Sequence, residues 1–165
     1  MSEFGRGCDV RELILTRHAK SDWGDPELPD HDRPLNARGL RDAPAMADRL
    51  AATGVEVQRI LSSTAVRARS TAAVFGAALG VEVELDEELY LASAAKLLTA
   101  AAGSDAGTVM VVAHDPGISD LASTLSDGGI THMPTCAVAR FTWQVDAWDE
   151  AVTRPADTWG LATPR

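Results

Sequence analysis

The chain has 165 residues, a formal net charge of −9 and two cysteines, a length that suits one compact domain with its own core. Cys8 and Cys136 are too few for a disulfide framework and lack the spacing of a zinc site. The acidic charge argues against nucleic acid or an anionic membrane as a partner. No apolar run reaches membrane-spanning length and the first residues lack the apolar core of a signal peptide, so we expect a reduced, cytoplasmic protein.

Short apolar runs alternate along the chain with longer amphipathic stretches. Asn36 and Gly54 bracket the first helical pattern as cap and stop, and Pro44 inside it predicts a kink or a start near Arg41. The expected strands cover 12–16, 59–63, 81–85, 108–113 and 137–145, and the expected helices 36–54, 64–80, 92–103 and 117–126.

Strands that alternate with helices predict a doubly wound α/β fold, in which a mostly parallel sheet carries helices on both faces. Neither a repeat nor a linker divides the chain, so we expect a single domain over 11–152. An extension over 1–10 precedes it, and a tail over 153–165, poorly ordered or packed on the surface, follows it. In such folds ligands bind beyond the carboxyl ends of the strands.

Two of the expected strands end on a histidine. His18 follows the first strand and His114 follows the run at 108–113, so a parallel sheet brings both imidazoles to one edge. Each histidine alone has a structural role as its ordinary alternative. Together they predict a site at that edge.

Arginines accompany these histidines. Arg17 precedes His18, and Arg67 lies in the first turn of the helix after the strand at 59–63, near the positive end of the helix dipole. Arg69 lies about 200° further around that helix, so both cannot face the site. A surface salt bridge is the ordinary alternative for Arg67. Such a cluster in an acidic protein indicates an anion site, with phosphate as the favoured ligand.

Four segments resemble the successive motifs of a known family. "TRHAKSDW", "DHDRPLNARG", "LSSTAVRARST" and "VMVVAHDPG" are similar to those of the histidine phosphatase superfamily, and above all to its short SixA-type phosphohistidine phosphatase branch. The resemblance extends from about residue 11 to about residue 145. It implies a fold like that of phosphoglycerate mutase.

The resemblance also implies roles for individual residues. His18 matches the nucleophile that receives the phosphoryl group, and the usual glycine after it is Ala19 here. The matching residues around it are Arg17 and Arg67, which bind phosphate, Arg33, which lies near the phosphate, and His114, the second histidine of the pocket.

The general acid is less well defined by the sequence. Asp115 follows His114 as in the His-Asp pair of the acid phosphatase branch, and Glu88 lies near the glutamate of mutase-like members. For both, a solvated or capping carboxylate is the alternative.

We therefore expect a phosphatase, acting most plausibly on phosphohistidine in a signalling or carrier protein such as a histidine phosphotransfer domain, and releasing inorganic phosphate without a metal or other cofactor. The chain has little room for the insertions that enclose small substrates. A phosphatase of small phosphorylated metabolites is the alternative within this class, and a mutase, which needs a lid, is less favoured.

Other classes fit the residues less well. A non-catalytic phosphate-recognition module has no need of a nucleophile such as His18. A dinucleotide-binding domain needs a glycine-rich turn after the first strand, which is absent. A metal hydrolase would use His18, His31 and His114 as ligands.

Overall fold

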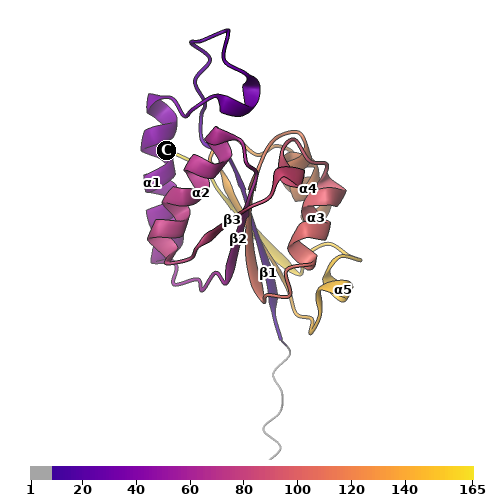
Figure 1. Ribbon diagram of the computed structural model, residues 1–165. Coiled ribbons are helices and arrows are strands. Elements are labelled where there is room, and N and C mark those ends of the chain that lie inside the picture. Colours follow the sequence, from indigo (N-terminus) through magenta and orange to yellow (C-terminus); the bar gives the residue numbers. More distant parts are fainter. Residues whose placement is uncertain (1–8) are drawn as a thin grey trace, which may run out of the picture.

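A six-stranded sheet in the order β3-β2-β4-β1-β5-β6 forms the centre of the molecule (Figure 1). The computed structural model describes residues 9–165, so most of the expected extension, with Cys8, lies outside the described residues. Strands β1 to β4 run parallel, whereas β5 and β6 pair antiparallel at one edge. The expected mostly parallel sheet is thus confirmed. The strands are β1 (Arg11–Arg17), β2 (Arg59–Ser62), β3 (Val83–Leu85), β4 (Thr108–Ala113), β5 (Val138–Trp143) and β6 (Thr158–Ala162).

Helices cover both faces of this sheet, as a doubly wound fold requires (Figure 1). On β1, Ile14 packs into the core beneath α1 and α2, while Leu13 and Leu15 pack into the core beneath α3 and α4. Burial on both faces explains why these strands are continuous apolar runs. The helices are α1 (Ala37–Ala52), α2 (Val66–Leu79), α3 (Ala94–Ala102), α4 (Gly117–Leu125) and α5 (Trp148–Ala151), and the 3-10 turns are η1 (Asp30–Asp32) and η2 (Glu87–Leu89). Of the helices in the described part of the chain, none is long and apolar enough to cross a membrane.

Helix α1 begins at Ala37, earlier than the alternative start near Arg41, and contains Pro44 in its interior. The Asn36 side chain accepts a hydrogen bond from the Gly39 N–H at 2.9 Å and so caps the first turn. A Cβ at Gly39 would lie 2.2 Å from the carbonyl oxygen of Lys20. Glycine therefore lets α1 pack directly on the backbone that follows β1.

The C-terminal segment, expected as a tail, contributes strand β6 instead. It pairs with β5 from Val138 opposite Ala162 to Thr142 opposite Thr158. The side chains of β6 are mostly exposed, including Trp159 and Leu161. Its place in the sheet depends on backbone pairing with β5.

The carboxyl ends of β1, β4 and β2 meet at one edge of the sheet. The His18 N–H donates to the carbonyl of Ala113 at 3.1 Å, and the Ser63 N–H donates to the carbonyl of Val112 at 3.1 Å. These bonds continue the parallel ladders by one residue beyond each strand. The residues that follow the strands are thereby brought together, as the sequence predicts.

Candidate active site

His18 lies at the centre of a pocket at this edge, with 7% of its surface exposed. Its Nδ1 lies 2.8 Å from the carbonyl oxygen of Ala19. A carbonyl oxygen can only accept, so Nδ1 carries the proton and Nε2 is unprotonated. Burial, assisted by the charges of Arg67 and Arg17, lowers the pKa of His18 to about 4. The imidazole is therefore neutral at physiological pH.

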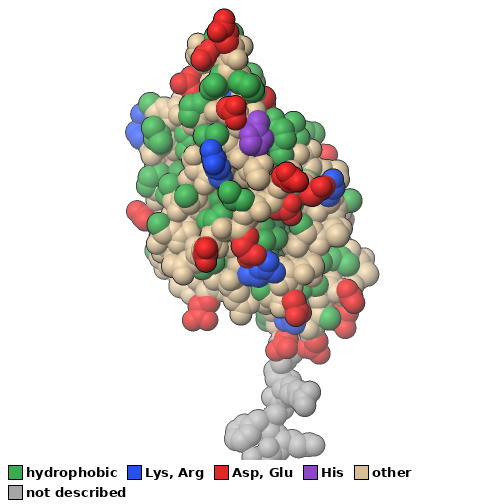
Figure 2. All heavy atoms as spheres, in the orientation of Figure 1, with side chains coloured by type: hydrophobic (Ala, Val, Ile, Leu, Met, Phe, Trp, Pro, Cys, Tyr) green, Lys and Arg blue, Asp and Glu red, His purple; other side chains and the backbone are tan. Residues whose placement is uncertain are grey.

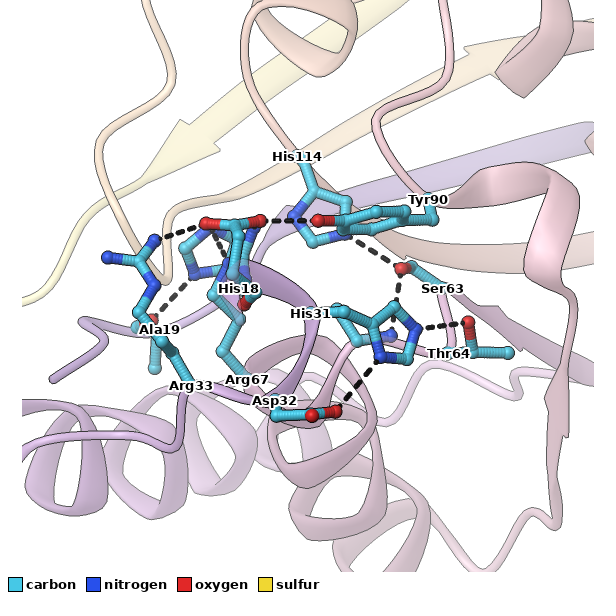
Figure 3. Close-up of polar contacts among 12 residues, drawn as sticks. His18, Ala19, His31, Asp32, Arg33, Ser63, Thr64, Arg67, Tyr90 and His114 are labelled. Atoms are coloured by element: carbon cyan, nitrogen blue, oxygen red, sulfur yellow. Dashed lines mark hydrogen bonds and ion pairs between the residues drawn. The ribbon is translucent and has the colours of Figure 1, made fainter. Parts of the chain in front are cut away.

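His114 lies beside His18, with a distance of 5.1 Å between the ring centroids. Its Nε2 is 2.7 Å from the Ser63 hydroxyl, while its buried Nδ1 has no partner in the protein. Burial, together with the neighbouring His18 and Arg67, lowers the pKa of His114 to about 3. Both imidazoles predicted from the strand ends are thus adjacent and uncharged (Figure 3).

Three arginines surround the histidines, and two of them are almost fully buried. Arg67 and Arg33 are 4% and 6% exposed, and Arg67 Nε approaches His18 Nε2 to 3.4 Å. Three guanidinium nitrogens are buried without a partner, namely Nε of Arg17 and both Nε and Nη1 of Arg33. Buried donors without partners are rare, and their concentration in one pocket is typical of an anion-binding site.

A carboxylate holds two of these arginines in place. Asp30 in η1 accepts a hydrogen bond from Arg33 at 2.6 Å through Oδ1 and one from Arg67 at 3.0 Å through Oδ2. The hydroxyl of Tyr90 also donates to Oδ2 at 2.5 Å, and the Tyr90 ring meets that of His114 edge to face at 5.4 Å. Desolvation raises the pKa of Asp30, but hydrogen bonds from Tyr90 and Arg67 outweigh it and lower the pKa to about 2.

Asp30 and Tyr90 are the site residues that sequence reasoning missed. "DHDR" resembles a solvated loop, yet Asp30 lies three residues before Arg33, which is the spacing of an ion pair across one turn. Tyr90 carries no local signal, because its contact with Asp30 joins segments sixty residues apart.

The two candidates for the general acid lie in different environments. Asp115 lines the pocket, forms an ion pair with Arg17 at 3.3 Å and accepts a hydrogen bond from Ser119 at 2.5 Å. Glu88 does not line the pocket, and its carboxylate forms an ion pair with Lys96 at 2.7 Å. The structure therefore brings Asp115, and not Glu88, to the histidines.

Two further sequence candidates lie outside the pocket. Arg69 is exposed on α2, away from Arg67. His31 Nε2 is hydrogen-bonded to Thr64 at 2.8 Å, and its ring contacts Tyr90. Within residues 9–165 no group of three or more His, Cys, Asp or Glu side chains is arranged to hold a metal ion.

Paired histidines and converging arginines at the carboxyl ends of parallel strands define a class of α/β protein built to bind phosphate. The model of the histidine phosphatase superfamily (branch 1) matches residues 13–90, a range that includes His18, Arg33 and Arg67. An uncharacterised chloroplast protein of Arabidopsis thaliana is 34% identical over 86% of this chain and 70% of its own length.

Two solved structures are similar over most of their length. A putative phosphohistidine phosphatase SixA of Nakamurella multipartita is 28% identical, with a TM-score of 0.82, over 94% of this chain and 96% of that one. A protein histidine phosphatase SixA in complex with tungstate is 25% identical, with a TM-score of 0.70, over 80% and 88% of the two chains. The chain belongs to the histidine phosphatase superfamily, in its SixA-type branch.

The two buried neutral histidines predict a loss of stability in mild acid. In the unfolded chain a histidine binds a proton below about pH 6.5, whereas His18 and His114 resist protonation until about pH 4 and about pH 3. The two histidines therefore make their whole contribution to the free energy of unfolding above pH 6.5. This contribution falls as the pH drops toward 4. We expect a loss of about 1–2 kcal/mol per histidine between pH 7 and 5, measured by urea denaturation.

The variant His114→Gln should show about half of this dependence on pH. His132 has a side chain that is 60% exposed, so His132→Gln serves as the matched control and should keep the slope of the unmodified protein. An unchanged slope in His114→Gln would contradict the assignment of a buried neutral imidazole.

Proposed function

We propose that this protein is a phosphatase that uses His18 as its nucleophile and removes the phosphoryl group from phosphohistidine on another protein. The observation that carries this proposal is the state of His18, a neutral imidazole whose unprotonated Nε2 accepts a hydrogen bond from the buried guanidinium group of Arg67. An imidazole attacks phosphorus only through an unprotonated nitrogen. A binding module would have no use for such a nitrogen at the centre of its anion site.

In the first step, the lone pair on His18 Nε2 attacks phosphorus and the bond from phosphorus to the leaving group breaks. The hydrogen bond from Nδ1 to the Ala19 carbonyl grows stronger as the ring becomes positively charged. Water then attacks the phosphohistidine, the bond from phosphorus to Nε2 breaks, and inorganic phosphate leaves. His18 returns to its neutral state.

Arg17, Arg33 and Arg67 would bind the equatorial oxygens of the phosphoryl group and neutralise their charge. The unpartnered nitrogens of Arg17 and Arg33 are the donors available for this task. His114 would hold its proton on Nδ1, with the Ser63 hydroxyl donating to Nε2, and so add a further donor. Since these side chains supply the positive charge, we infer a metal-independent reaction.

The size of the pocket supports a substrate carried on a protein. The cavity among these residues has a volume of about 180 Å³, below the range of about 300–1,000 Å³ that is typical of sites enclosing a small molecule. It has room for a phosphoryl group and little more. A small phosphorylated metabolite remains the alternative substrate and is tested in the same assays.

Turnover should pass through a phosphoenzyme in which His18 carries the phosphoryl group. Rapid quenching during turnover of a phosphohistidine protein should capture an acid-labile, base-stable phosphoenzyme, and His18→Ala should abolish both it and turnover. His31→Asn should retain activity, as should the unmodified protein after treatment with EDTA. Turnover by His18→Ala would refute the nucleophile, and loss of activity in EDTA would favour the metal hydrolase.

The second prediction separates two arginines on one helix. Arg67→Ala should lower kcat/KM about a hundred- to a thousandfold, because it removes a buried donor to the transition state. Arg69→Ala should retain activity, since Arg69 is exposed and does not line the pocket. Equal losses in steady-state assays of the two variants would mean that α2 presents another face to the phosphate.

The third prediction concerns the leaving group. An alkoxide needs a proton in the transition state, whereas a phosphohistidine ring can take up a proton beforehand, since imidazole titrates near about 6.5. Asp115→Asn should therefore slow phosphohistidine hydrolysis less than about tenfold and slow any phosphate monoester hydrolysis more steeply. Glu88→Gln should stay within the same tenfold limit. A thousandfold loss on phosphohistidine in either variant would favour the small-metabolite phosphatase.

A further inference from the structure

Two large apolar side chains are exposed at the mouth of the phosphate pocket. Trp23 is 69% exposed and Leu91 is 55% exposed, and both line the pocket although they come from separate segments of the chain. Trp23 lies between β1 and η1, and Leu91 follows η2. The segment between β1 and η1 projects beyond the sheet (Figure 1). Exposure of apolar side chains to water is energetically unfavourable. Their position at one opening indicates that a partner covers them.

The backbone of Leu91 strengthens this interpretation. Its φ angle is +52°, in the left-handed region that costs a residue with a side chain about 1–2 kcal/mol. Glycine or asparagine would adopt this conformation more readily. Strain of this kind persists where the surrounding structure imposes it, and it is often found at ligand-binding sites.

Trp23 connects the mouth of the pocket to its floor. The guanidinium carbon of Arg33 lies 3.2 Å from the centroid of the Trp23 ring, a cation–π contact that covers one face of the indole. Much of the ring remains exposed. Trp23 therefore offers an apolar surface directly beside a phosphate-binding arginine.

The two segments that carry these side chains are acidic. Asp22, Asp25 and Glu27 flank Trp23 and are exposed, as is Glu87 shortly before Leu91, whereas Glu88 is paired with Lys96. Figure 2 shows acidic side chains gathered at the tip of the projecting segment. The floor of the pocket is cationic, so its opening combines an apolar surface with negative charge. A free, highly anionic metabolite would be repelled by this charge, whereas basic groups would be attracted.

We propose that Trp23, Leu91 and these acidic side chains form a docking rim for a phosphorylated protein whose phosphorylated residue is flanked by apolar and basic side chains. The proposal deepens the proposed function and depends on it. The pocket would hold the phosphoryl group, and the rim would hold the surface around it. Contacts of this kind contribute to KM for a protein substrate and are unavailable to a small one.

Leu91→Asn is the most specific variant with which to test the docking rim. Asparagine tolerates the left-handed backbone, so the substitution removes the apolar side chain without adding strain. Leu40→Asn is the matched control, since Leu40 is 63% exposed on α1 and does not line the pocket. Trp23→Ala is less informative because it also removes the contact with Arg33.

The experiment compares kcat/KM for three substrates with a common leaving group. These are a phosphohistidine peptide flanked by leucines and lysines, the same peptide with glutamates in place of lysines, and phosphoimidazole. The lysine peptide should exceed the glutamate peptide at least tenfold, and this preference should shrink at high salt. Leu91→Asn should lose at least fivefold more on the lysine peptide than on phosphoimidazole, chiefly through KM, and Leu40→Asn should match the unmodified protein on all three.

Two results would overturn the proposal in distinguishable ways. If phosphoimidazole is hydrolysed but the peptides show no charge preference, or Leu91→Asn affects all substrates equally, the docking rim is wrong and the phosphatase stands. If the unmodified protein hydrolyses none of the three, the proposed function fails and the docking rim fails with it.

Discussion

The hydrogen bond from His18 Nδ1 to the Ala19 carbonyl is the contact on which the rest of the site depends. It fixes the tautomer, and thereby leaves Nε2 unprotonated, with Arg67 Nε as its hydrogen-bond donor at 3.4 Å. The backbone around it is held from three directions. The Cys136 N–H donates to the carbonyls of Arg17 and His18, the His18 N–H donates to Ala113, and the Ala19 N–H donates to the hydroxyl of Thr71. Ala19, where the family usually has glycine, buries its methyl group completely in the core beneath α1 and α2.

Burial of His18 has an electrostatic consequence for the whole pocket. A protein with a net charge of −9 keeps two imidazoles neutral by placing them among guanidinium groups, away from solvent. Asp30 balances part of the arginine charge and stays ionised, because Tyr90 and Arg67 stabilise its carboxylate. Protein partners hold all three arginines, and Arg17 and Arg33 in addition keep buried nitrogens without a partner. An anion that enters meets a site that requires little rearrangement.

The sequence predicts the parts of this arrangement that local pattern controls. Continuous apolar runs that end on His18 and His114 indicate parallel strands, and a parallel sheet necessarily brings their ends together. Arg67 could be separated from Arg69 by helical geometry alone. The motif resemblance added Arg33, which no periodicity would have selected.

Features that depend on contacts between distant segments escaped prediction. Asp30 has a role in the site only because Tyr90 and Arg67 contact it from distant parts of the sequence. Strand β6 forms only because it pairs with β5. Of the two effects expected from Pro44, the start near Arg41 is wrong, since the predicted cap at Asn36 begins the helix at Ala37. Glu88 has the carboxyl group that a general acid needs, but it lies outside the pocket and is paired with Lys96.

The proposed chemistry depends on a neutral His18 with its proton on Nδ1, and nuclear magnetic resonance reports this protonation state. Long-range proton–nitrogen correlation of the His18 ring, assigned with His18→Gln, reports both its charge and its tautomer. We expect a neutral ring with its proton on Nδ1 throughout pH 5 to 8. An imidazolium at pH 6, or a neutral ring with its proton on Nε2, would contradict it.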